Sequence, residues 1–231
     1  MNWFRTFFIV SSLICMLTCS VFASFTTTHL TTEQFESLLI SPAFIATSIV
    51  TDTVTSSQDR TCDISMQLPD IATTTSGNFV WSDNDTINFS LICDAASQSL
   101  TFVVGQTSLD LAVSFPNGFI DMFIMAGSSH HKNSIQINNL VLDGIGVSDS
   151  ATASASQDIL QISGANLSGS FVLTGQAAMI WKGNGPKNSA LQFEILSQPR
   201  PPESIPEPAT IIILGSGCML LGHSARKKRA S

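Results

Sequence analysis

Ile87-Asn88-Phe89-Ser90-Leu91 alternates apolar and polar side chains at every position, and Leu191-Gln192-Phe193-Glu194-Ile195 repeats the pattern much further along. Because successive side chains of a strand point to opposite faces of a sheet, this alternation predicts half-buried β-strands. Ten segments rich in β-branched and aromatic residues are predicted as strands, namely Phe79–Trp81, Thr86–Cys93, Leu100–Val104, Leu109–Ser114, Phe119–Met125, Ser134–Leu142, Ile159–Ser163, Gly169–Leu173, Gln176–Trp181 and Ala190–Leu196.

Turn sequences separate these segments, among them Asp83-Asn84-Asp85, Pro116-Asn117-Gly118 and Gly183-Asn184-Gly185-Pro186. The connections hold no helical pattern long enough for a βαβ unit, so the sheets are expected to be antiparallel. The predicted fold class is all-β: an antiparallel two-sheet sandwich of the jelly-roll or lectin-like kind, with a barrel as the alternative.

A short helix is predicted near the start of this domain. Thr31-Thr32-Glu33-Gln34 has the spacing of a capping box, with Gln34 at the third helical position. Phe35, Leu38 and Leu39 then fall on one helical face, and the helix is expected to end before Pro42.

The exported part divides by composition into three regions. Residues 24–77 form an irregular N-terminal part with the short helix, and Thr47–Ser57, rich in Thr, Ser and Val, suits an exposed or edge strand. Residues 78–197 are predicted to form the sandwich core. Residues 198–205 are a Pro-rich linker, for which an extended polyproline conformation is expected.

The N-terminus has the features of a secretory signal helix, residues 1–23. One cation, Arg5, precedes the uncharged run Phe7–Phe22, and small residues precede a predicted cleavage site between Ala23 and Ser24. A lipoprotein signal around Cys19 is the competing interpretation, but a Leu stands where a small residue is needed.

The C-terminus combines three parts in a fixed order. Pro206-Glu207-Pro208 precedes an apolar run at 209–222, and the basic cluster Arg226-Lys227-Lys228-Arg229 follows. Helical rise over that run gives only about 21 Å, short of the roughly 30 Å bilayer core, although snorkelling cations narrow the gap. The basic cluster favours the cytoplasmic face for this end, which places the bulk of the chain outside. A buried core helix with a basic tail is the alternative.

These three parts, with the Gly215-Ser216-Gly217 break in the apolar run, resemble the PEP-CTERM sorting signal, residues 206–231. That family belongs to Gram-negative bacteria that make extracellular polysaccharide. The resemblance implies that a membrane-embedded exosortase recognises Pro206, Glu207 and Pro208, cuts near them, and removes or exchanges the transmembrane sorting helix and its basic stop.

Two cysteines belong to the exported domain. Cys15 and Cys19 lie in the signal and Cys218 lies in the tail, which leaves Cys62 and Cys93. Two thiols in an exported chain predict one disulfide, worth roughly 3–4 kcal/mol in the chain-entropy model. Neither cysteine has a second Cys or a His at metal-ligand spacing.

Charge excludes one class of partner. Residues 24–207 hold five Lys and Arg but all seventeen Asp and Glu, a net charge of −12. Nucleic-acid binding needs clustered cations, so it is not expected. The same charge disfavours tight binding to acidic polysaccharide without bridging divalent cations, and it predicts solubility outside the cell.

A second, looser resemblance covers the middle of the chain, roughly 78–195. Asp85–Leu91, Phe102–Gly105, Ser134–Leu142 and Ile162–Ala165 resemble the "choice-of-anchor" group of exported bacterial domains. That group has no general assigned activity, so the resemblance implies a class and no chemistry. Lectin-like sandwiches are a weaker likeness.

The sequence offers few candidates for catalysis or metal binding. His130 and His131 are neighbours in a polar loop, where adjacent side chains are expected to point apart. Asp83 and Asp85 could offer oxygens to calcium, but the Gly and Glu of an EF-hand loop are missing. Ser163 lacks the flanking glycines of a nucleophile elbow. Neither catalytic residues nor a cofactor nor a metal site is predicted.

Trp81 and Trp181 are the candidate sugar-stacking residues, although aromatic residues in strands more often belong to the core. The chain is therefore predicted to be a non-enzymatic, exported component of the cell envelope or extracellular matrix, structural or adhesive and associated with exopolysaccharide. Signal peptidase and an exosortase are its expected processing partners, and the C-terminal helix holds it transiently at the membrane. A carbohydrate-binding, lectin-like module is the alternative.

Overall fold

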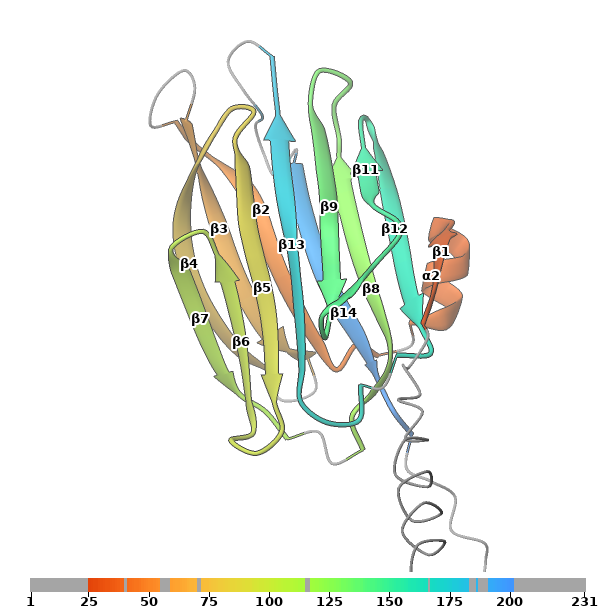
Figure 1. Ribbon diagram of the computed structural model, residues 1–231. Helices are drawn as coiled ribbons and strands as arrows, with labels where there is room; N and C mark the ends of the chain where they lie inside the picture. The colour runs from red at the N-terminus through yellow and green to blue at the C-terminus, as the bar shows by residue number, and fades with distance from the viewer. Residues whose placement is uncertain are drawn as a thin grey trace, which may run out of the picture. The chain divides into compact units, whose positions relative to one another are not determined.

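The protein is mostly β-structure in two antiparallel sheets that pack face to face (Figure 1). The computed structural model describes residues 25–201 except 40, 55–58, 70–71, 115–116, 166, 183–185 and 187–190. The strands belong to one compact unit, Met1–Arg200. The predicted all-β sandwich of antiparallel sheets is therefore confirmed.

Sheet A is the back layer in Figure 1 and has seven strands. Their order is β1 (Thr26–Leu30), β12 (Ser156–Ser163), β8 (Phe119–Ser128), β14 (Leu191–Pro199), β2 (Phe44–Val54), β3 (Asp59–Leu68) and β4 (Thr73–Ser82).

Sheet B, the front layer, also has seven strands. Their order is β10 (Ile145–Gly146), β9 (Ser134–Leu142), β13 (Phe171–Ile180), β5 (Thr86–Asp94), β6 (Ser99–Val104) and β7 (Thr107–Ala112), and β11 (Ala151–Ala153) pairs separately with β9.

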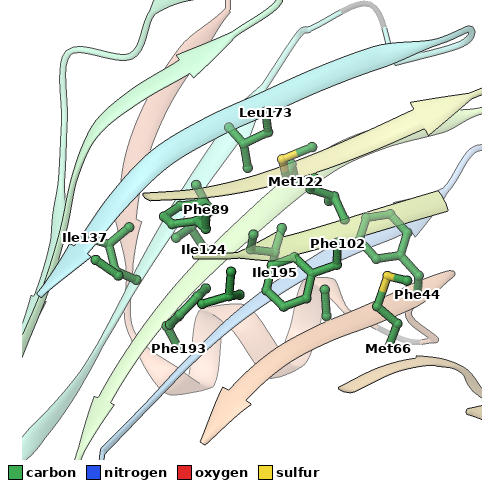
Figure 2. Close-up of a cluster of buried hydrophobic side chains, with 14 of the residues drawn as sticks. Phe44, Met66, Phe89, Phe102, Met122, Ile124, Ile137, Leu173, Phe193 and Ile195 are labelled. Carbon is green, nitrogen blue, oxygen red and sulfur yellow. The ribbon is translucent and has the colours of Figure 1, made fainter. Parts of the chain in front are cut away.

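The main core fills the space between the sheets. Figure 2 shows side chains from both layers converging there, with Phe89 and Phe102 from sheet B and Phe193 from sheet A among them. The ring centroids of Phe89 and Phe193 are 5.2 Å apart, and those of Phe102 and Phe193 are 6.1 Å apart. Both stretches with the clearest alternation thus supply central core residues, because their apolar positions all face inward.

A second apolar cluster covers part of the outer face of sheet A. Phe123, Met125, Ile159 and Leu196 form its buried part. The helix α2 (Thr32–Leu38) packs on this cluster through Phe35, whose ring meets that of Phe123 edge to face at 5.3 Å. The helix therefore closes a sheet face that would otherwise expose large apolar side chains to water.

The capping box predicted for this helix is confirmed. The Thr31 side chain accepts a hydrogen bond from the Gln34 backbone N–H at 3.2 Å, and the Gln34 side chain accepts one from the Thr31 N–H at 2.9 Å. Phe35 and Leu39 pack against the sheet, whereas Leu38 is 40% exposed, so the predicted apolar face is narrower than expected.

The N-terminal part contributes more to the sandwich than its composition indicated. The prediction that Thr47–Ser57 includes an exposed or edge strand is wrong, since β2 begins at Phe44 and lies between β14 and β3. Strand β3 was not among the predicted strands, although its Cys62, Ile64, Met66 and Leu68 all face the core. The proposed boundary at residue 77 falls inside β4.

Two segments predicted as separate strands near the end of the domain belong to one strand. Gly169–Leu173 and Gln176–Trp181 form the single strand β13, with an irregular register between Thr174 and Gln176. The extra residue lies on β9, and burial alternates along β13 through Gly175, so the strand continues across the residues between the two predicted segments.

The structure contradicts the predicted disulfide, because Cys62 and Cys93 are both free and buried. Cys62 lies in sheet A, three residues after the start of β3, and Cys93 lies in sheet B, seven residues after the start of β5. The start of β3 pairs with the end of β4, and a short turn leads from there into β5, so both strands begin at the same end of the sandwich. At about 3.3 Å per residue the two cysteines are offset by roughly 13 Å along the strands, too far for a disulfide.

The thiols of Cys62 and Cys93 are expected to be unreactive in the folded protein. Burial, and then the Asp63 carboxylate, raises the pKa of Cys62 to about 12. Burial, and then the Asp94 carboxylate, raises the pKa of Cys93 to about 11. The thiolate is the reactive form, so neither cysteine has the character of a nucleophile.

Candidate functional site

The outer face of sheet B carries a shallow groove of about 350 Å³ across β9, β13, β5 and β6. This face is turned toward the viewer in Figure 1. Its lining residues are Asn88, Phe89, Ser90, Val103, Gly105, Asn139, Thr174, Gly175 and Gln176, none of which is ionisable. The groove thus offers amides, hydroxyls and aliphatic surface without charge.

Three amide side chains form a ladder across the groove. The Asn139 Nδ2 on β9 donates to the Gln176 Oε1 on β13 at 2.6 Å. The Gln176 Nε2 then donates to the Asn88 Oδ1 on β5 at 3.0 Å. Gln176 lies directly opposite Asn88 in the strand register, so the sheet itself brings the middle and end of the ladder together.

An extra residue on β9 positions the other end of the ladder. Gln176 pairs with Asn138 and Thr174 pairs with Val141, so two residues of β9 stand opposite Gly175 alone. Asn139 adopts a left-handed backbone with φ of 51°, a conformation that Asn tolerates better than most residues. The resulting bulge places two consecutive asparagines near the groove, as bulges commonly re-aim side chains at functional sites.

Gly175 forms the floor of the groove. A Cβ atom at this position would lie 2.6 Å from Cζ of Phe89 and 2.8 Å from Cδ2 of Leu140. Only glycine therefore lets the core ring of Phe89 pack beneath the strand without displacement.

Aliphatic side chains adjoin the ladder on the same face. Val103 lines the groove, and Val172, which is 41% exposed, stands opposite Ile92 one strand away. Val141 stands opposite Thr174 on the neighbouring strand. The face therefore combines a row of amides with a band of aliphatic surface.

The tryptophans do not contribute to any sugar-binding face. Trp81 is 0% exposed and Trp181 is 3% exposed, so neither can stack on a sugar ring in solvent. The indole N–H of Trp81 donates to the Asp85 carbonyl at 3.2 Å, and the Arg60 guanidinium lies 6.0 Å from the centre of the Trp181 ring. These contacts give both tryptophans a role in packing one end of the sandwich.

One of the two candidate calcium residues, Asp83, has a structural partner. Asp83 accepts a hydrogen bond from the backbone N–H of Trp181 at 2.9 Å, which joins the turn after β4 to the end of β13. Over the part of the chain that the structure describes, no three His, Cys, Asp or Glu side chains are arranged to hold a metal ion.

His130 and His131 differ from expectation in their geometry. Their rings stack at 4.4 Å with an interplanar angle of 23°, so the side chains do not point apart. The His130 Nδ1 accepts a hydrogen bond from the Lys132 backbone N–H at 3.2 Å. The backbone after β8 forms a tight turn and is not extended, which explains why the side chains of His130 and His131 share a direction.

A smaller hollow of about 240 Å³ lies near the end of β5 and is lined by Asp94, Gln98 and Ser168 among others. The Asp94 carboxylate is occupied by the Ser97 hydroxyl at 2.7 Å and the Ala96 N–H at 2.9 Å. These hydrogen bonds, that of Ser97 first, lower the pKa of Asp94. The carboxylate thus serves the turn after β5.

The residues predicted for export and sorting lie outside the described part of the chain. These are the cleavage pair Ala23 and Ser24, the motif Pro206–Pro208, the apolar run and the basic residues Arg226–Arg229. Among the residues that are described, no helix has the length and apolar character needed to cross a bilayer.

Comparison with protein-family models and with curated proteins gives no match for this chain. The groove residues were not among the site residues predicted from the sequence, which were Trp, His and Asp. The signals that could have drawn notice were the pair Asn138-Asn139 inside a strand and the outward positions of Asn88 and Gln176. Only the strand order shows that these amides meet.

Proposed function

We propose that this protein is an exported, non-enzymatic component of the cell envelope or extracellular matrix, structural or adhesive and associated with exopolysaccharide. The observation that carries the proposal is the pairing of an N-terminal signal sequence with the three-part C-terminal tail. The lectin-like class of sandwich expected from sequence belongs to the same proposal.

The route to the cell surface follows from the two ends. Signal peptidase cuts between Ala23 and Ser24, and the apolar run with its basic stop holds the chain in the inner membrane. An exosortase then acts at Pro206–Pro208. The two prolines support this step because proline fixes its own φ and disfavours helix in the residue before it, which favours access of a processing enzyme to the backbone.

The described domain is compatible with a binding or scaffolding role. The groove on the outer face of sheet B has no ionisable lining residue that could act as a general acid or base. Amides and hydroxyls are groups that can hold a ligand by hydrogen bonding.

Cell fractionation of two variants tests the proposal. The double substitution Pro206→Ala with Pro208→Ala removes the sorting motif, and Pro201→Ala with Pro202→Ala is the matched control in the preceding linker. The motif variant is expected to accumulate unprocessed in the membrane fraction, while the control follows the unaltered protein. Intact-mass measurement then gives both cleavage points. An unchanged distribution and mass for the motif variant would show that the tail is not a sorting signal.

A further inference from the structure

We infer that the groove on the outer face of sheet B binds a neutral, hydroxyl-rich glycan chain through the amide ladder Asn139–Gln176–Asn88. This inference rests on the proposed function, because export brings the groove to extracellular polysaccharide. It assigns binding to the amides and takes it away from the two buried tryptophans.

The ladder has hydrogen-bonding capacity to spare. Its two internal bonds use one donor of Asn139, the acceptor and one donor of Gln176, and the acceptor of Asn88. A side-chain amide carries two donors and an acceptor with two lone pairs, so the Asn139 carbonyl oxygen and the Asn88 amino group can still take partners. Vicinal sugar hydroxyls both donate and accept, which matches an acceptor at one end and a donor at the other.

An orphan acceptor lies next to the ladder. Asn138 stands opposite Gln176 in the register, and its Oδ1 is buried with no hydrogen-bond partner. Unsatisfied buried acceptors are uncommon in folded proteins and call for an explanation such as a bound water or ligand. This acceptor is enclosed and Asn138 does not line the groove, so it is no part of the proposed contact with the glycan.

The groove is organised before any ligand arrives. The hydrogen bonds between the three amides restrict their rotamers. The bulge at Asn139 fixes the backbone position from which the Asn139 side chain extends. A site that is ordered in advance loses less conformational entropy on binding. Its volume of about 350 Å³ is at the small end of the range for ligand sites, which suits a short segment of a longer chain.

Charge selects neutral glycans over acidic ones. The groove lining holds no cation, and the edge strand β7 carries the exposed Asp110, which accepts a hydrogen bond from the Thr101 hydroxyl at 2.6 Å. Residues 24–207 carry a net charge of −12. Uronate, sulfate and phosphate groups would meet repulsion here without a compensating Lys or Arg.

The aliphatic band supplies the second half of sugar recognition. Val103 lies in the groove and Val172 stands exposed beside it. The C–H face of a pyranose ring can cover such side chains and remove apolar surface from water. The amide row and the aliphatic band together match the polar edge and the apolar face of a sugar.

Calorimetric titration of the processed, secreted protein tests the inference. The probes are neutral hexasaccharides of glucose, galactose, mannose and xylose, with oligogalacturonate as the acidic comparator. Binding is expected for at least one neutral probe and not for oligogalacturonate. Heteronuclear NMR should then show shifts of the Asn88, Asn139 and Gln176 side-chain amide signals on addition of the bound probe.

Variants locate the site. Gln176→Met keeps the side-chain length but removes both ladder bonds, and it should weaken binding by at least about tenfold, equivalent to about 1.4 kcal/mol. Asn88→Ala, at an exposed position, is a second variant in case the first alters the fold. Gln67→Met, an exposed amide on the outer face of sheet A, is the matched control and should bind like the unaltered protein.

The outcomes separate this inference from the proposed function. Absence of binding to every neutral probe, or binding that both ladder variants leave unchanged, overturns the glycan site. Stronger binding of oligogalacturonate than of any neutral probe also overturns it. None of these results bears on sorting, because the fractionation of the Pro206 and Pro208 variant is independent of the groove.

Discussion

The two outer faces of the sandwich differ in what covers them. On sheet A, the helix α2 and neighbouring strands enclose Phe123, Met125, Ile159 and Leu196, and Phe123 is 0% exposed. On sheet B, the corresponding surface carries the amide ladder and the 41% exposed Val172. One face is therefore closed by apolar packing and the other is open and polar.

The apolar packing on the outer face of sheet A stabilises the fold, whereas the polar outer face of sheet B is accessible to a partner. Large apolar side chains on an outer sheet face demand a cover, and the chain supplies one through the capped helix. The face lined with amides needs no cover, because polar side chains that hydrogen-bond to one another can face solvent without exposing large apolar surface. The open face is for this reason the better candidate for a partner.

The largest loss of stability is expected from a substitution on the closed outer face of sheet A. Phe123→Ala removes a fully buried ring and its edge-to-face contact with Phe35, so it should lower the free energy of unfolding by about 3–5 kcal/mol. Val172→Ala on the open face should cost less than about 1 kcal/mol, since its side chain is already 41% exposed. Urea denaturation measures both, and equal losses would contradict the contrast between the faces.

An intermediate effect is expected at the floor of the open face. Gly175→Ala places a methyl group 2.6 Å from Cζ of Phe89 and should destabilise by about 1–3 kcal/mol through overpacking. Gly146→Ala is the control, because a Cβ there meets nothing within 4 Å. Thermal melts of the two variants should separate clearly, and a Gly175→Ala protein as stable as its parent would mean that Phe89 can move aside.

A smaller effect loosens the cover of the closed face. Thr31→Ala removes the side-chain acceptor of the capping box and should cost about 1 kcal/mol of stability. Hydrogen exchange should show faster exchange for the first turn of α2 in Thr31→Ala than in Ser37→Ala, whose exposed hydroxyl donates to the Gln34 carbonyl at 2.7 Å. Equal protection in both variants would show that packing of Phe35 alone holds the helix.

The smallest effect is a pH dependence on the closed face. Glu194 lies on β14 between Met125 and Thr47, and burial raises the pKa of its carboxyl group. The folded state therefore binds the proton more tightly than the unfolded state, and stability falls as pH rises from the ordinary value of 4.5 through the raised pKa.

Replacing the carboxyl group of Glu194 tests the direction of this pH dependence. Glu194→Gln should be more stable than the parent at neutral pH and should lose the advantage below the ordinary carboxyl value of 4.5, where both side chains are neutral. Gln192→Glu, two residues earlier on the same strand face, controls for added charge. Denaturation across the pH range measures the difference, and a variant less stable than the parent at neutral pH would reverse the assignment.

Local patterns predicted local structure well. Enrichment in β-branched and aromatic residues between turn sequences located most strands from β4 onward, and the predicted bounds of β9 agree with the observed Ser134–Leu142. The capping box at Thr31 was predicted correctly because its two hydrogen bonds span only three residues. Strand β3 was missed because its core positions include Arg60 and Cys62, which do not look apolar in a sequence.

The site and the cysteines depend on which strands become neighbours. The ladder joins residues that are 37 and 88 positions apart in the chain. The pairing expected for Cys62 and Cys93 failed because β3 and β5 belong to different sheets and carry their cysteines at different heights. No short-range pattern carries information about either arrangement.

The sequence by itself determined the strand-rich class, the helix cap and the two terminal segments that motivate the export proposal. The physical reason is that alternation, capping and hydrophobic length act within a few residues of each other. Only the tertiary structure decided that the tryptophans are buried, that the thiols are apart, and that Asn139, Gln176 and Asn88 share one groove. Those outcomes follow from the order of strands in each sheet, which long-range pairing fixes.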